Sequence, residues 1–193
     1  MGRREERRQA VRQRIVEAAV ELHSTVGPAR TTISAIAERA GVQRLTVYRH
    51  FPDELSIFMA CTGHGLATLP PPDQAAWRRR TDPVARLQEA LTDLYAYYRR
   101  REPVLVNVQR DAPLMPVLQR VMAARYGEYF ASARKTLSAG WGVRGRQRTL
   151  LVAALGHAID FQTWRSLVRQ HGLSDDQAVE LMVCLVRCAA EGG

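Results

Sequence analysis

Side chains that can recognise nucleic acid gather between residues 44 and 50, where the chain reads RLTVYRH. Arginine, threonine, tyrosine and histidine donate hydrogen bonds to phosphate oxygens and to base edges, which is the chemistry of a DNA-reading helix. They reach DNA together only if the apolar residues between them face inward. The residues predicted on or near the outer faces of this segment are Arg44, Leu45, Thr46, Tyr48, Arg49 and His50.

Two short helices joined by a tight turn are predicted to hold this segment in place. Thr31 or Thr32 can cap the first helix, because a threonine hydroxyl accepts a hydrogen bond from an amide two or three residues on. Gly41 can end it, because glycine adopts the left-handed conformation common at helix ends at little cost. The apolar face of this first helix is predicted to comprise Ile33, Ile36, Ala37 and Ala40.

The second helix is predicted to begin near Gln43 or Arg44 and to bury Val47 and Phe51. Val42 then fills the angle between the two helices. A short helix, a glycine turn and a helix that presents arginine, threonine, tyrosine and histidine form the pattern of a helix-turn-helix, whose second helix reads the major groove. The pattern therefore predicts a DNA-binding protein.

Residues 31–51 resemble the DNA-binding core of the TetR family of bacterial transcriptional regulators. The resemblance rests on the threonine pair, the IA..AGV turn and the TVYRHF ending, and it continues upstream in RIVEAAVELHSTVG and downstream in FPDELSIFMA. It implies an all-α fold, with a three-helix DNA-binding domain over residues 1–52 and a helical ligand-binding and dimerisation domain over residues 53–193. One position departs from the family, because Glu54 stands where a lysine often touches a DNA phosphate.

The resemblance also implies roles for single residues in DNA binding. Arg44 would reach base edges, where its fork can pair with guanine O6 and N7, and Leu45 would touch a thymine methyl group. Ser34 would also reach a base, while Thr46, Tyr48 and His50 would hold phosphates. The DNA-binding residues expected on these grounds are Thr32, Ser34, Arg44, Leu45, Thr46, Tyr48, Arg49 and His50.

The charge of the chain agrees with a polyanionic partner. Among 193 residues, 28 are basic and 19 acidic, which gives a formal net charge of +9. Lys135 is the only lysine, so the excess is almost entirely arginine. Such a skew is also what a biased genomic base composition would produce, and charge by itself leaves both explanations open.

The three cysteines predict no disulfide framework, because their number is odd and small. Cys184 and Cys188 lie four residues apart, which suits either half of a metal site or a pair of buried structural thiols. No histidine or aspartate neighbours them, so we expect buried thiols and no metal. The chain shows no signal peptide and no apolar stretch long enough to cross a membrane, so we expect a cytoplasmic protein with no membrane partner.

The N-terminal residues Gly2–Arg14 are rich in arginine and are predicted to form a mobile basic arm. It either lies along DNA phosphates or in the minor groove, or it is a solvated tail. A supporting helix is expected from about Gln9 to Val26, packed against Ile33, Ile36 and Val47.

The remainder of the chain is predicted to be helical. A helix is predicted over residues 53–66, with Gly63 and Gly65 weakening its C-terminal end. The resemblance implies that this helix links the two domains and that its tilt resets the spacing of the reading heads. Residues 68–83 are predicted to form a loop. Ser174 would cap the final helix. Further helical segments are predicted at residues 84–101, 103–109, 114–138, 146–170 and 175–190.

A pocket for an apolar or aromatic small molecule is expected in the second domain, because its aromatic and methionine residues recur among few ionisable ones. The alternative for each is ordinary core packing. His157 and Asp160 stand out, because ionisable groups among apolar neighbours need a partner or a function. The expected ligand-binding residues are Tyr95, Tyr98, Met122, Tyr126, Phe130, His157, Asp160, Phe161 and Trp164, with Asn107 and Met115 as further candidates.

No motif of an enzyme is present, and a single His157–Asp160 pair does not make a di-metal site, so we expect neither catalysis nor a cofactor. The last two helices are expected to form a homodimer as a four-helix bundle. The leading hypothesis is a repressor that binds a palindromic DNA operator as a homodimer and is released by a small-molecule inducer. The alternatives are a dimeric DNA-binding regulator without an inducer, and a helical enzyme or binding module with a vestigial helix-turn-helix.

Overall fold

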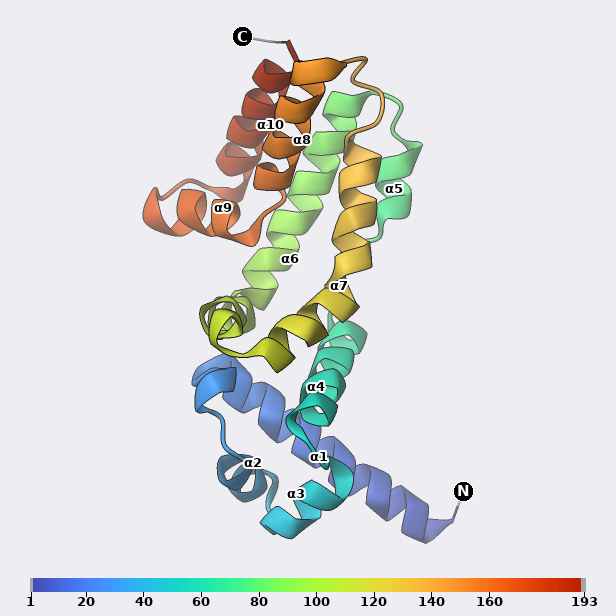
Figure 1. Ribbon diagram of the computed structural model, residues 1–193, viewed down its shortest axis with the longest axis vertical. Coiled ribbons are helices and arrows are strands. Elements are labelled where there is room, and N and C mark those ends of the chain that lie inside the picture. Colours follow the sequence, from blue (N-terminus) through green and yellow to red (C-terminus); the bar gives the residue numbers. More distant parts are fainter. Residues whose placement is uncertain (1, 192–193) are drawn as a thin grey trace. The chain divides into compact units, whose positions relative to one another are not determined.

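The computed structural model describes residues 2–191, and the predicted all-α fold is confirmed (Figure 1). The part of the chain that the structure describes contains helices and no strand. It divides into two compact units. The head unit runs to Pro70 and includes Glu102–Tyr126, and the C-terminal unit comprises Pro71–Arg101 and the residues from Gly127 onward.

The helix-turn-helix forms as predicted in the head unit. The Thr32 hydroxyl accepts a hydrogen bond from the backbone N–H of Ala35 at 3.1 Å, and Gly41 is left-handed with φ 64°. The second helix starts after Gln43. The helical segments from the N-terminus to the end of this region are α1 (Arg3–Thr25), η1 (Pro28–Arg30), α2 (Ile33–Ala40), α3 (Arg44–His50) and α4 (Glu54–Thr68).

One apolar core joins these helices, which explains why such short helices are stable. Val47 and Ile15 are fully buried, and Phe51 is nearly so. Tertiary packing of this kind supplies most of the stability of a helix of seven or eight residues. The core comprises Ile15, Val16, Ala18, Ala19, Ile36, Ala37, Ala40, Val47, Phe51, Ile57 and Cys61.

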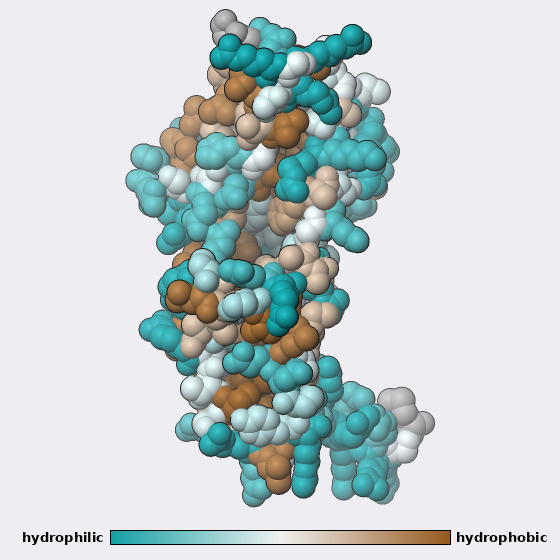
Figure 2. All heavy atoms as spheres, in the orientation of Figure 1, coloured by the Kyte–Doolittle hydropathy of each residue, from teal (hydrophilic) through white to brown (hydrophobic). Residues whose placement is uncertain are grey.

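The predicted basic arm is instead the beginning of α1, which starts at Arg3. Glu5 accounts for this correction, because it lies in the first turn, where a carboxylate interacts favourably with the helix dipole. It also accepts hydrogen bonds from Arg8 Nε at 3.0 Å and from Gln9 Nε2 at 2.9 Å, and such i,i+3 and i,i+4 contacts stabilise the first turns. Figure 2 shows these turns, at the lower right, covered with hydrophilic side chains.

A capping box starts α4. The Asp53 carboxylate accepts from the N–H of Ser56 at 2.7 Å, and the Ser56 hydroxyl accepts from the N–H of Asp53 at 3.4 Å. The helix continues through Gly63 and Gly65 before the prolines that follow Leu69.

Two sequence expectations for the middle of the chain were wrong. The region predicted as a loop contains α5, held by the Asp73 cap and by Trp77, which is fully buried and donates to Asp93 at 2.8 Å. The two segments predicted around Pro103 form one helix, α6, although proline removes a backbone donor. The segments here are α5 (Gln74–Arg79), α6 (Pro83–Asp111), η2 (Ala112–Leu114) and α7 (Pro116–Leu137).

The predicted helix over residues 146–170 is broken at Ile159 and Asp160. The Asp160 carboxylate caps a new helix by accepting from the N–H of Gln162 at 2.6 Å, which competes with continuation of the helix before it. Ser174 caps the final helix as predicted, and accepts from the N–H of Gln177 at 3.1 Å. The last segments are α8 (Gly145–Ala158), α9 (Phe161–Arg165), a π-helical turn η3 (Ser166–Gln170) and α10 (Asp175–Glu191).

The prediction of buried thiols is wrong for Cys184 and Cys188, which are exposed, whereas Cys61 is buried. The two exposed cysteines share a face of α10 with the exposed Leu181 and Leu185, which turns away from the core of the C-terminal unit. Within residues 2–191 no group of histidine, cysteine and carboxylate side chains is arranged to hold a metal ion. The described helices also lack any that is long and apolar enough to span a bilayer.

Candidate nucleic-acid interface

The outer face of α3 carries the predicted DNA-reading side chains in exposed positions. Leu45 is 58% exposed and Tyr48 is 44% exposed, so both side chains are open to a binding partner. Arg44 and Arg49 are also exposed, and His50 is half-buried. On the preceding helix, Thr32 and Ser34 are exposed, so the surface extends to the N-terminus of α2.

The inner face of α3 fixes the direction of these side chains. Val47 lies three residues after Arg44 and has no exposed surface, and Phe51 at the helix end is 2% exposed. An ion pair between Arg39 of α2 and Glu21 of α1 adds a polar tie on the outside of the same bundle. Side chains on a helix whose other face is locked approach a partner with little loss of entropy.

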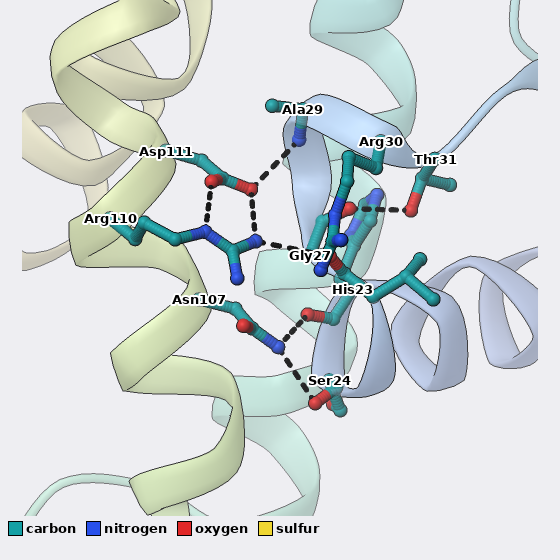
Figure 3. Close-up of polar contacts among 10 residues, drawn as sticks. His23, Ser24, Gly27, Ala29, Arg30, Thr31, Asn107, Arg110 and Asp111 are labelled. Atoms are coloured by element: carbon teal, nitrogen blue, oxygen red, sulfur yellow. Dashed lines mark hydrogen bonds and ion pairs between the residues drawn. The ribbon is translucent and has the colours of Figure 1, made fainter.

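A second group of contacts holds the chain that enters the helix-turn-helix, and it involves residues far away in the sequence (Figure 3). Asn107 of α6 donates to the carbonyl oxygens of His23 at 3.1 Å and of Ser24 at 2.8 Å. These carbonyls end α1 and lack partners within the helix. Asn107 therefore caps the C-terminus of α1 from another helix.

The end of α6 also binds the turn after α1 (Figure 3). The buried Asp111 carboxylate accepts from the N–H of Ala29 at 2.9 Å and from Arg110 Nε at 2.6 Å. Arg110 Nη2 donates in turn to the carbonyl of Val26 at 3.0 Å. Arg110 and the Ala29 amide lower the pKa of Asp111 despite its burial, so this carboxylate is charged at neutral pH. We call Asn107, Arg110 and Asp111 the α6 clasp.

Gly27 is the residue that allows the α6 clasp to close. Its backbone lies at φ 96° and ψ 157°, a region essentially restricted to glycine. A Cβ atom there would lie 2.0 Å from Arg110 Nη2 and 2.6 Å from Asp111 Oδ2. The requirement for glycine is therefore both conformational and steric.

His23 fills the space beneath the α6 clasp. It is 6% exposed, and its ring lies 5.3 Å from the ring of Phe58 on α4. Burial lowers its pKa to about 4, although the nearby charge of Asp111 acts in the opposite direction. The imidazole is therefore neutral at physiological pH and behaves as a core residue between α1 and α4.

The expected ligand-binding residues do not form one cluster. Four of them, Tyr95, Tyr98, Phe161 and Trp164, pack together in the C-terminal unit, with the ring of Tyr98 at 5.5 Å from Phe161 and 6.2 Å from Trp164. The Tyr95 hydroxyl donates to the carbonyl of Ala158 at 2.9 Å, and the Tyr98 hydroxyl donates to that of Ile159. These hydroxyls thus satisfy carbonyls at the end of α8.

His157 and Asp160 lie on a different surface of the same unit. Both are exposed and line an open hollow of 260 Å³ together with Thr163, Ser166 and Met182. A hydrogen bond of 3.1 Å joins the Thr163 hydroxyl to His157 Nδ1. The hollow thus offers a carboxylate, an imidazole and hydroxyls beside the apolar side chains of Leu167 and Met182.

The remaining candidates belong to other parts of the fold. Phe130 packs edge-to-face on Tyr129 at 5.2 Å. Met122 and Met115 lie in the head unit beside Phe58, and Tyr126, also in that unit, is 8% exposed. Asn107, a further candidate for the pocket, binds the end of α1 instead. Its role was missed because the carbonyls that it caps come from a helix more than 80 residues earlier in the chain.

Comparisons with known families and solved structures support the helix-turn-helix and the all-α fold. The family described as bacterial regulatory proteins, tetR family, matches residues 15–61. Comparison with curated protein sequences finds no match. A solved TetR-like transcriptional regulator from Rhodococcus sp. RHA1 is 18% identical with a TM-score of 0.64, and the match covers 95% of this chain and 97% of that one.

Two further solved structures were determined with small molecules bound. A transcriptional regulator from Saccharomonospora viridis in complex with choline is 21% identical, with a TM-score of 0.59 and coverage of 91% of this chain and 95% of that one. RolR in complex with resorcinol is 17% identical, with a TM-score of 0.52 and coverage of 96% and 94%. At such identities the likeness establishes the fold. The family match adds that residues 15–61, which hold the helix-turn-helix, are similar to the tetR family of bacterial regulatory proteins.

Proposed function

We propose that the protein is a ligand-responsive transcriptional repressor that binds a palindromic operator as a homodimer. The observation that carries the proposal is the exposed polar face of α3, on a helix whose opposite face is fully buried. Such a helix can enter the major groove without refolding, because the side chains behind it are already packed. The function is recognition and includes no chemical step.

Arg44 is the proposed base-reading residue, and its replacement tests the DNA-binding part of the proposal. Arg44→Ala is expected to cost roughly 1–3 kcal/mol and to relax preference at one base pair of each half-site. Tyr48→Phe is the matched control, because loss of a phosphate contact weakens binding to all sequences alike. Mobility shift on the DNA upstream of the gene, with base-substituted duplexes, measures both. Unchanged base preference in Arg44→Ala would assign base reading to another residue.

The homodimer is proposed to form through α8 and α10. Leu181 and Leu185 of α10 are 45% and 40% exposed, and Val152 of α8 is 40% exposed. Apolar side chains left on two packed helices suit a two-fold interface, in which the same patch from each copy makes a four-helix bundle. Two-fold symmetry would then set the recognition helices about one turn of DNA, ~34 Å, or a multiple of it apart. Light scattering that finds a monomer in the unmodified protein would contradict this arrangement.

A small apolar or aromatic ligand is proposed to act on the C-terminal unit. Two separate places in this unit are candidates for it: the buried aromatic cluster around Tyr98 and Trp164, and the open hollow beside His157 and Asp160, which offers polar groups. The regulators bound to choline and to resorcinol have the same fold. These two compounds are therefore the first probes for a thermal-shift screen.

A dimeric DNA-binding regulator without an inducer remains the second candidate, and one observation favours it. The hydroxyls of Tyr95 and Tyr98 are already engaged by backbone carbonyls, and Trp164 has no exposed surface. A ligand among these rings would have to displace existing contacts. A screen in which no small molecule raises the melting temperature would favour this second candidate.

Ligand binding can release DNA only if the ligand prefers a conformer whose reading heads are wrongly spaced. The helix α4 is the proposed lever, because Phe58 on it packs against His23 of α1. A coupling of about 1–3 kcal/mol would weaken operator binding by roughly 5–150-fold, and operator would weaken ligand binding by the same factor. Calorimetry of a screened ligand with and without saturating operator measures this factor. Equal affinities would show that the ligand is not an inducer.

A further inference from the structure

The N-terminal turns of α1 carry a row of arginines that the helix-turn-helix does not include. Arg4, Arg8 and Arg12 recur every fourth residue and therefore lie on one face of α1, about 6 Å apart along its axis. All three are exposed. Since α1 is helical from Arg3, these charges have fixed positions relative to the core that α1 shares with α3.

Arg12 is the arginine that reaches the end of α3. Its guanidinium lies 4.9 Å from the centroid of the Phe51 ring, and that ring lies 6.4 Å from the ring of His50. Phe51 is buried in the core of the head unit, so it provides a rigid platform for the cation. Within residues 2–191 no carboxylate pairs with Arg12, whereas Arg8 is bonded to Glu5.

The two charged side chains that shift the pKa of His50 are both arginines. Burial lowers the pKa of His50, and the charges of Arg8 and Arg12 on α1 lower it further. Arg49 precedes it on its own helix. The carboxylates nearest in sequence, Asp53 and Glu54, begin α4, where Asp53 is occupied as the helix cap. Cations that are gathered in this way repel one another, and an anion bound among them would relieve the repulsion.

We propose that Arg12 and His50, with Arg8, form a binding site for one phosphate of the DNA backbone, adjacent to the groove in which α3 reads bases. The site would extend the interface from the helix-turn-helix onto α1. It rests on the proposed function, because it presumes that α3 docks on DNA. The role of Arg12 is to bind the phosphate directly, on the platform that Phe51 provides.

Occupation of this site changes the protonation of His50. In the free protein the arginines favour the neutral imidazole. A phosphate adds a negative charge that offsets them, so His50 takes up one proton from solvent and becomes an imidazolium that donates to the phosphate. DNA affinity therefore rises as the pH falls through the pKa of the DNA-bound imidazole, by at most tenfold per pH unit for one linked proton.

The salt dependence of binding tests the phosphate contact. Fluorescence anisotropy of the full chain on a duplex of random sequence gives the slope of log Kd against log salt concentration. Arg12→Gln should reduce the magnitude of this slope by about 0.9, the value for one phosphate contact, and Arg12→Lys should retain it. Arg14→Gln is the matched control, because Arg14 is an exposed arginine of α1 that lies outside the row formed by Arg4, Arg8 and Arg12. Equal slopes for Arg12→Gln and Arg14→Gln would overturn the proposal.

The pH dependence tests the imidazole with a different readout. Affinity of the unmodified protein should increase toward pH 5.5, and His50→Gln should abolish that increase while leaving the circular dichroism spectrum unchanged. If the ligand is the DNA backbone, inorganic phosphate should displace the duplex no better than chloride at equal ionic strength. Stronger displacement by phosphate would identify free phosphate as the ligand. If Arg12→Gln binds DNA with the unmodified slope, only this inference fails. If the unmodified protein binds no duplex, the proposed function fails with it.

Discussion

Tyr48 of the helix-turn-helix differs from two tyrosines of the C-terminal unit in how its hydroxyl can be used. Tyr48 in the head unit is 44% exposed on α3, whereas Tyr95 and Tyr98 in the C-terminal unit are buried and donate to carbonyls of residues 158 and 159. The first arrangement leaves donors free for an external partner on a rigid helix. The second uses the donors inside the fold. The head can therefore bind without internal rearrangement, while a ligand among the buried aromatic rings must exchange existing contacts for new ones.

Exposed leucines also differ between α3 and α10, and replacing those of α10 should have the largest effect of all, on dimerisation. Replacing Leu181 and Leu185 together with glutamate would place unpaired charges in the proposed two-fold interface, where each ion costs several kcal/mol. We expect the dissociation constant of the dimer to rise by more than roughly 1,000-fold, a change that sedimentation velocity detects. Leu45→Glu is the control, because it changes an exposed leucine in the head. It should weaken DNA binding and preserve the dimer, and a dimer that survives both leucine changes in α10 would place the interface elsewhere.

Two glycines with positive φ, one in each unit, should differ next in the cost of an added methyl group. Gly27→Ala should cost the head unit roughly 3 kcal/mol, since it adds backbone strain to a clash with the α6 clasp. In the C-terminal unit, Gly142 has φ 70° and no atom within 4 Å of an added Cβ, so Gly142→Ala should cost only about 1–2 kcal/mol. Urea denaturation followed by circular dichroism compares them. Equal losses would mean that the turn after α1 yields to the new methyl group.

His23 gives the head unit its own pH dependence. Its pKa is about 4 in the folded state against a reference of 6.5, so below pH 6.5 the unfolded chain binds more protons than the folded one. Stability should be complete above pH 6.5 and fall by about 2 kcal/mol between pH 6.5 and pH 5, at 1.36 kcal/mol per pH unit. His23→Gln should remove this fall. The exposed His157 of the C-terminal unit serves as the control, and a fall that persists in His23→Gln would point to another group.

The helix-turn-helix could be predicted because its determinants are local. Thr32 caps its helix by accepting from an amide three residues on, and Gly41 takes the left-handed conformation at the end of the same helix. Val47 lies at the helical spacing that buries it. The same holds for Ser174, which caps α10 through the amide of Gln177. Signals of this kind act over one helical turn, so a sequence pattern contains them in full.

The errors arose where tertiary contacts decided the outcome. Asn107 lies in a helical segment rich in valine, and only the end of α1, distant in the sequence, shows that it is a cap. The helix α6 passes through Pro103 although proline alone predicts a break, and α1 starts early because Glu5 staples its first turn. Cys184 and Cys188 lie on a face of α10 that packs against no other part of the single chain, so they are exposed. Propensity is a weak prior in all these cases, because packing overrides it.

The same substitution made in both units gives the smallest expected effects and the sharpest comparison. Tyr98→Phe removes the donor to the Ile159 carbonyl, which stays buried, and should lower the free energy of unfolding by roughly 1–2 kcal/mol without a direct effect on DNA affinity. Tyr48→Phe removes a solvent-exposed hydroxyl, so the free energy of unfolding should change by less than about 0.5 kcal/mol. If the Tyr48 hydroxyl donates to a phosphate, its loss should weaken binding to every duplex by about 1 kcal/mol, or roughly fivefold. Urea denaturation and fluorescence anisotropy on the two variants give both quantities, and each variant is the control for the other. Two outcomes would contradict the contrast between an exposed Tyr48 that serves an external partner and buried tyrosines that bond within the C-terminal unit. One is a Tyr48→Phe protein that loses stability, and the other is a stable Tyr98→Phe protein that loses DNA affinity.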